Sequence, residues 1–216
     1  MAARTGRAAT AAKRMAARTR TTGRTAARAR TTPARARRSP GPRLDSLRSL
    51  FIEEIRDLYD AEHQILKALP KMVSAASHSD VKSALENHRR ETEEHVRRLE
   101  QVFEDCGVPA RARRCEGMAG VIQEGTETVQ AAVDPDVRDA AIIESAQKVE
   151  HYEMAGYGTV RTFAQRLNMP ECASVLQRTL DEEKQADRKL TDIAESAVNV
   201  HAAEAEGGDE ESEEME

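Results

Sequence analysis

The sequence has no tryptophan, only three tyrosines and three phenylalanines, and no run of apolar residues long enough to span a membrane. It also lacks runs of β-branched residues and the apolar segment of a signal peptide. Its three cysteines, Cys106, Cys115 and Cys172, are far apart and form no Cys-x-x-Cys pair. These absences argue against strands and against a membrane protein, and they predict reduced, buried thiols in a cytoplasmic protein.

Acidic residues are absent from residues 1–43, which carry 12 arginines and one lysine and therefore a charge of +13. The remaining residues carry −18, because the net charge is −5, and eight of their acids lie in 204–216. Neither end has enough large apolar side chains to offset the entropy lost on ordering. We therefore expect a disordered basic arm at 1–43, one domain at 44–199 and a disordered acidic tail at 200–216.

Apolar residues in the middle of the chain recur at helical spacing, which predicts an all-α domain. Asp134 before Pro135 is typical of a helix start, and Gly107 is typical of a helix end. Short connections separate the first two and the last two long helices, whereas about 28 residues, including a short helix, lie between these pairs. Two αα-hairpins with one long crossover indicate a ferritin-like four-helix bundle. The expected helices span 45–74, 79–106, 115–131 (the short one), 135–167 and 171–199.

Helical wheels put acidic or imidazole side chains inside the apolar stripe of each long helix. Counting from the loops at about 1.5 Å per residue brings most of them to one level near mid-bundle, with His95 at a different level and His151 facing outwards. A buried, isolated carboxylate costs more than a domain's net stability, so water, protons or cations must neutralise the set. Carboxylates with imidazole suit iron or manganese better than zinc. The candidate ligands of such a metal site, which could hold two ions, are Glu62, His88, Glu91, Glu150, Glu153, Glu183 and Asp187.

Five stretches of the chain are similar to the YciE/YciF-like ferritin-like stress-protein family: "IRDLYDAEHQILKALPKM", "HRRETEEHVRRLEQVF", "RCEGMAGVIQE", "QKVEHYEMAGYGTV" and "LDEEKQADRKLTDIA". The resemblance covers about residues 44–198 and neither end of the chain. It implies a ferritin-like bundle that forms a homodimer and takes part in a bacterial stress response.

Ferritin-like di-metal proteins take a Glu from each of two helices and a Glu-x-x-His pair from each of the other two. This chain departs from that pattern, because His88 precedes Glu91 in the second helix and the last helix contains no histidine. The sequence therefore leaves three alternatives open. They are a metal site with, at most, ferroxidase- or peroxide-type activity, a weak or asymmetric metal site, and a bundle without metal, either in a nucleoid-associated binding protein or in a structural dimer.

The basic arm predicts sequence-independent binding of DNA, because cations that neutralise phosphates release counterions. No aromatic residue lies among these cations, so stacking on single-stranded bases is not expected. In this hypothesis the protein is cytoplasmic and associates with the nucleoid. Two alternatives stay open, namely an arm that folds back onto the acidic remainder and an organelle transit peptide. The residues expected to contact phosphates are Arg4, Arg7, Lys13, Arg14, Arg18, Arg20, Arg24, Arg28, Arg30, Arg35, Arg37 and Arg38.

Overall fold

The computed structural model describes residues 44–207, and the predictions for the basic arm and for residues 208–216 lie outside the described residues. Within this range the chain is helical and contains no strand, which confirms the predicted all-α fold. None of the described helices combines the length and the apolar character needed to cross a membrane. The elements are α1 (Leu47–Ala75), α2 (Ser79–Asp105), α3 (Glu116–Ala131), α4 (Pro135–Arg166), α5 (Pro170–Ile193), the π-helical turn η1 (Ala194–Val198) and α6 (Asn199–Gly207).

Local sequence explains where several helices begin and end. The Asp134 carboxylate accepts hydrogen bonds from the first free backbone N–H groups of α4, and Pro135 takes the first helical position, as predicted. Ser46 and Ser49 form a capping box at the start of α1. Gly107, with φ +67°, follows α2 in the left-handed conformation that ends many helices. The boundaries of these helices are therefore encoded locally.

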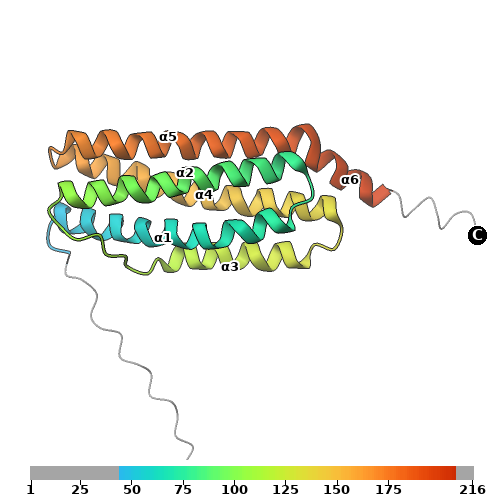
Figure 1. Ribbon diagram of the computed structural model, residues 1–216, viewed down its shortest axis with the longest axis horizontal. Helices are drawn as coiled ribbons and strands as arrows, with labels where there is room; N and C mark the ends of the chain where they lie inside the picture. The colour runs from blue at the N-terminus through green and yellow to red at the C-terminus, as the bar shows by residue number, and fades with distance from the viewer. Residues whose placement is uncertain (1–43, 208–216) are drawn as a thin grey trace, which may run out of the picture. The chain divides into compact units, whose positions relative to one another are not determined.

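The four long helices form a bundle in which α1 contacts α2 and α4, and α5 contacts the same two helices. The short helix α3 belongs to the crossover and packs along the side of the bundle formed by α1 and α4 (Figure 1). This arrangement is the predicted pair of αα-hairpins joined by a crossover. It leaves four helix faces directed at a common interior.

The last helical stretch is longer than the sequence indicates. Helix α5 passes into η1 and α6, so the chain remains helical to Gly207 instead of ending its helix at 199. Val198, 2% exposed, anchors this extension in the core, and the alanine- and glutamate-rich residues that follow have high helix propensity. The prediction of a disordered tail from residue 200 is thus corrected for 200–207.

Two apolar clusters fill the bundle, one toward each end. One cluster surrounds Ile65 and Leu85 and includes the contacts with α3. The other surrounds Phe51 and Leu176 at the opposite end. The level between them holds buried polar side chains from all four long helices: Glu62, His88, Thr92, His95, Glu150, Glu153 and Glu183.

Candidate metal centre

The four long helices each direct at least one carboxylate or imidazole into the layer between the two apolar clusters. Glu62, His95, Glu153 and Glu183 are 0% exposed. These side chains occupy the apolar faces of their helices, so the fold that buries the core residues buries them as well. Their charge must therefore be balanced inside the bundle.

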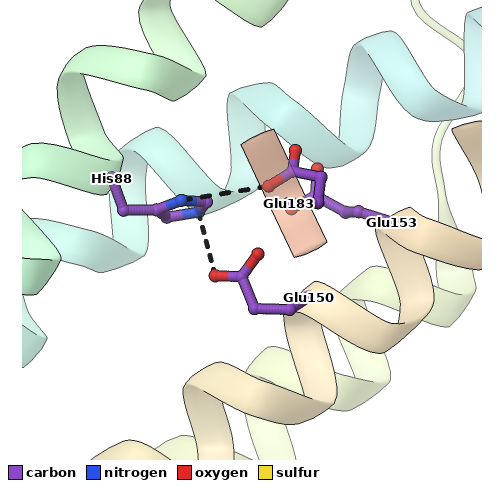
Figure 2. Close-up of side chains that lie close together, drawn as sticks. All are labelled: His88, Glu150, Glu153 and Glu183. Carbon is purple, nitrogen blue, oxygen red and sulfur yellow. Dashed lines mark ion pairs between the residues drawn. The ribbon is translucent and has the colours of Figure 1, made fainter. Parts of the chain in front are cut away.

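A first group consists of His88 from α2, Glu150 and Glu153 from α4, and Glu183 from α5 (Figure 2). One ligand atom from each of the four lies within 4.8 Å of the others. The His88 Nε2 atom is 3.5 Å from Glu150 Oε1, and its Nδ1 atom is 4.0 Å from Glu183 Oε2. Such a set of three carboxylates and one imidazole can surround one cation.

A second group consists of Glu62 from α1, His95 from α2 and the same Glu183. The His95 Nδ1 atom is 3.5 Å from Glu62 Oε1 and 3.0 Å from Glu183 Oε1. Glu183 thus directs Oε1 toward His95 and Oε2 toward His88. A carboxylate in this position can bridge two cations.

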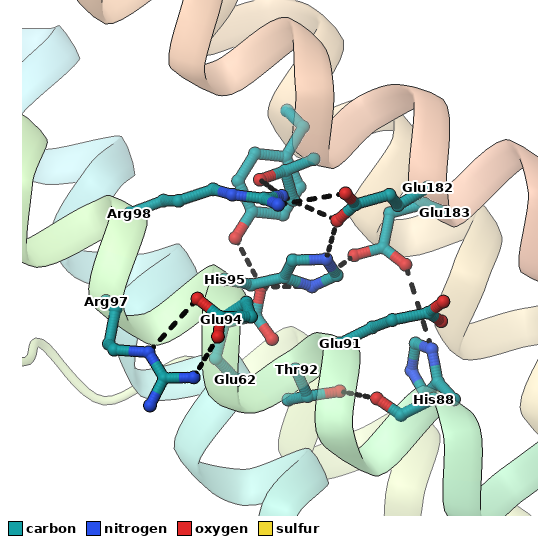
Figure 3. Close-up of polar contacts among 12 residues, drawn as sticks. Glu62, His88, Glu91, Thr92, Glu94, His95, Arg97, Arg98, Glu182 and Glu183 are labelled. Carbon is teal, nitrogen blue, oxygen red and sulfur yellow. Dashed lines mark hydrogen bonds and ion pairs between the residues drawn. The ribbon is translucent and has the colours of Figure 1, made fainter.

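Outer partners orient the side chains of the second group (Figure 3). The Nε2 atom of His95 is 2.9 Å from Glu182 Oε2, and the Arg98 guanidinium holds that carboxylate with two hydrogen bonds of 2.5 and 2.9 Å. A carboxylate only accepts, so Nε2 carries a proton. Nδ1 is directed at Glu62 and Glu183, and it would give up the second proton of the imidazolium to bind a cation. The Tyr157 hydroxyl donates to Glu62 Oε1 and so leaves Oε2 without a partner.

Electrostatics in this layer are set by burial and by neighbouring charge. Burial, followed by the charge of Glu183, raises the pKa of Glu150, and burial followed by the charge of Glu62 raises the pKa of Glu153. Burial also acts to raise the pKa of Glu183, but the close approach and positive charge of His95 outweigh it and lower that pKa. Without a cation, protons on Glu150 and Glu153 and the positive charge of His95 offset the charge of the layer.

The pKa of His95 is raised, although burial alone would lower it, because Glu62, Glu182 and Glu183 stabilise the imidazolium. The pKa of Glu182 falls to about 2, although burial alone would raise it, because His95 and Arg98 both hydrogen-bond to the carboxylate. Glu182 is therefore a fixed anion behind the imidazole. Carboxylate, imidazole and metal in this order form a common arrangement in metal sites.

The protein itself leaves many atoms of this layer unsatisfied, whereas buried polar atoms usually have hydrogen-bond partners. All of them are carboxylate oxygens or imidazole nitrogens, and no thiol contributes to either group, a donor set that fits iron or manganese. We conclude that the residues present fit a pair of such cations. The buried atoms of the two groups without a hydrogen-bond partner are Glu62 Oε2, His88 Nδ1 and Nε2, His95 Nδ1, Glu150 Oε2, both oxygens of Glu153 and both oxygens of Glu183.

Two of the ligands expected from the sequence lie outside both groups. Glu91, at the edge of its apolar stripe, accepts a hydrogen bond of 2.7 Å from the Asn87 side chain. Asp187 accepts one of 3.1 Å from Gln147 and lies 3.3 Å from the Nε2 atom of His151. His151 is exposed and directed outwards, where the wheel put it. The five expected ligands that the fold does bring together are Glu62, His88, Glu150, Glu153 and Glu183.

His95 is not among the ligands expected from the sequence, although the helical wheel puts it inside the apolar stripe. Side chains on a helix lean toward its N-terminus, and α1 and α2 run antiparallel, so Glu62 and His95 lean toward each other. Because the two side chains converge, His95 reaches the ligand layer although its backbone lies at a different level. Both imidazoles of the layer thus come from α2, where His88 and His95 share one face, instead of from two different helices. The spacing of seven residues was the available signal.

Comparisons of sequence and of structure with known proteins match the same helical part of this chain. The profile of a family described as a domain of unknown function (DUF892) matches residues 46–203. Protein YciF of Escherichia coli (strain K12) is 39% identical over 160 residues, which are 74% of this chain and 96% of YciF. The crystal structure of the E. coli stress protein YciF superposes with a TM-score of 0.70 and covers 72% of this chain and 99% of that one. YcfI from Rhodopseudomonas palustris is 38% identical with a TM-score of 0.69, covering 71% and 98%.

A more distant structure extends the comparison of folds. Ferritin-like, diiron-carboxylate proteins from Bacillus anthracis str. Ames superpose with a TM-score of 0.53 at 16% identity, covering 69% of this chain and 99% of that one. At this identity the likeness concerns the fold alone. It confirms the ferritin-like architecture expected from the order and spacing of the helices.

Proposed function

The chain belongs to the DUF892 family, together with the YciF-like stress proteins that it resembles in sequence. We propose that it is a stress-response protein that binds iron or manganese at mid-bundle. One observation carries this proposal. Two groups of buried ligand atoms share Glu183, and most of these atoms have no hydrogen-bond partner in the protein. Cations would satisfy these atoms and balance their charge.

The first group, around His88, would hold one ion and the second group, around His95, would hold the other, with Glu183 common to both. Two redox-active ions would supply the electrons for ferroxidase- or peroxide-type chemistry when bound. The protein's own contribution is orientation, since Glu182 directs the His95 ring and Tyr157 directs the Glu62 carboxylate. The apolar clusters above and below the layer exclude water from it.

Metal content tests the proposal directly. Full-length protein purified without chelators, then titrated with Fe(II) in the absence of oxygen or with Mn(II), is expected to retain about two ions per chain after gel filtration, one for each ligand group. Elemental analysis of the protein fraction measures this ratio. If only traces of either metal stay with the protein, a structural role for the bundle replaces the proposal.

Glu182→Gln is expected to lower the affinity for the second ion by about tenfold and to leave the affinity for the first ion unchanged. Tenfold is the lower end of the usual effect of residues that hydrogen-bond to a metal ligand. The glutamine oxygen can still accept from His95 Nε2, but without the negative charge the imidazole is a poorer ligand. Competition with a chromophoric chelator measures both affinities. Glu94→Gln is the matched control, because Glu94 is exposed and pairs with Arg97 away from the layer. A uniform loss at both positions would contradict the assigned role.

The basic arm provides a second proposal, supported by its 13 cations and its lack of acids. We infer that it binds DNA without sequence preference and holds the protein at the nucleoid in the cytoplasm. A chain truncated to begin at Leu44 is expected to lose this binding, and the full chain is expected to lose affinity steeply as salt rises. Gel-shift titration measures both effects, and equal binding by the two chains would rule out a role of the arm in DNA binding.

The expected homodimer is tested separately by sedimentation of the truncated chain. A monomer would contradict this expectation.

A further inference from the structure

A partly enclosed cavity of about 60 Å³ lies beside the candidate metal centre, in the apolar half of the bundle that includes α3. Helices α1 to α5 all contribute to its walls, which are built largely from aliphatic side chains such as Ile65, Leu85 and Leu190. His88 and Glu150 of the first ligand group also line it. The cavity therefore leads to the pair of ligands whose Nε2 and Oε1 atoms are 3.5 Å apart.

Apart from the two ligands and the exposed Lys189, the polar side chains that line the cavity already have hydrogen-bond partners. The Ser145 hydroxyl donates to the Ala141 carbonyl at 2.7 Å. The Asn87 amide donates to Glu91 at 2.7 Å. A polar molecule would thus lose its hydrogen bonds to water on entering and would regain few of them on the way to the metal ligands.

The two sides of the cavity differ in exposure. Toward α2 and α5 its lining includes Lys189, which is exposed, and the partly exposed Asn87 and Glu91. Toward α1 and α4 the crossover helix covers it with Val121 and Ile122. The gap between α2 and α5 is therefore the side from which a molecule can enter.

We propose that this cavity binds a small apolar molecule of the size of dioxygen next to His88 and Glu150, an inference that rests on the proposed metal centre for its role. The volume selects the ligand class. Apolar cavities of about 150 Å³ stay dry and bind benzene or xenon. A cavity of about 60 Å³ accepts a diatomic gas but excludes a ring. Hydrogen peroxide, which is strongly hydrated, is disfavoured by the same walls, so the cavity selects dioxygen as the oxidant that reaches the centre.

Xenon and dioxygen, applied under pressure to the metal-free full-length protein, test the cavity without any reaction. Xenon is expected to shift the methyl resonances of Ile65, Leu85 and Leu190, and paramagnetic dioxygen is expected to speed the relaxation of the same methyls. Methyls of the opposite cluster, such as those of Leu176 and Val160, are expected to respond much less. Equal responses in both clusters would overturn the proposal.

A cavity-filling variant sharpens the test. Ala84 lines the cavity, and Ala84→Val is expected to lower the xenon and dioxygen responses by about tenfold through loss of volume. The matched control is Ala173→Val, in the opposite cluster and buried to a similar degree, which is expected to leave both responses unchanged. If Ala84→Val does not fold, Ala146→Val, at a partly exposed position of the same lining, replaces it.

Two further outcomes would overturn the proposal: unchanged gas binding in the filled variant, or ordered water in the wild-type cavity detected by water–methyl Overhauser effects. Failure of the proposed function is distinct, because the metal titration needs no gas and the gas measurement needs no metal. Metal uptake without gas binding would contradict the proposed cavity ligand and leave the proposed metal centre unaffected.

Discussion

Replacing Glu183 by glutamine is expected to abolish metal binding at both positions of the centre. Glu183 is the one residue that both ligand groups share, and its two oxygens face different imidazoles. Each ion would lose an anionic ligand, and the two ions would lose the carboxylate that can screen their mutual repulsion. The loss in affinity should exceed the roughly 10–100-fold that outer partners contribute. Titration with Fe(II) without oxygen, or with Mn(II), measures the retained ions.

Two matched variants control for the removal of a charge. Glu91→Gln alters a carboxylate on α2, and Asp187→Asn alters one on α5. The sequence predicts both residues as ligands, but the fold directs their side chains away from both ligand groups. Both variants are expected to retain about two ions per chain, as in the wild type. Equal losses in these variants and in Glu183→Gln would mean that overall charge, and not the geometry of the two groups, governs metal binding.

Metal is also expected to raise the thermal stability of the wild type strongly, because the ligands are brought together only in the folded state. One ion present at about 1,000 times its dissociation constant contributes about 4 kcal/mol to the free energy of unfolding. In a chain of this size each kcal/mol moves the midpoint by roughly 2–4 °C, so a rise of about 8–16 °C is expected for a single ion. Calorimetry of chelated and metal-loaded protein measures the change.

Glu150→Gln is expected to be more stable than the wild type without metal and less stable than the wild type with metal. In metal-free protein the amide removes a buried carboxyl that Glu183 repels, and its N–H₂ group can donate to that neighbour, which stabilises the fold by about 1 kcal/mol. With metal present the variant lacks a ligand of the first ion and should be less stable than the wild type. A structural bundle without metal predicts the first result but no response of the wild type to metal salts, so the two hypotheses separate in one experiment.

Much of the fold follows from local sequence. Helical periodicity is a property of each segment alone, so it indicated the four long helices, the crossover helix and the inward direction of Glu62, Glu150, Glu153 and Glu183. Capping is equally local, and Asp134 begins α4 where its side chain predicts. The end of the last helix was less predictable, because its extension depends on the burial of Val198 in a distant core.

Local sequence patterns are sufficient to predict a ferritin-like bundle whose helices direct carboxylates and an imidazole inwards. Which of these side chains meet depends on how the helices pack. The antiparallel lean of side chains on α1 and α2 brings His95 to Glu62, whereas Asp187 is directed toward Gln147 and away from both groups. The contact of Glu182 with His95 and Arg98 and the shared position of Glu183 likewise depend on the stagger of whole helices, which no single segment encodes.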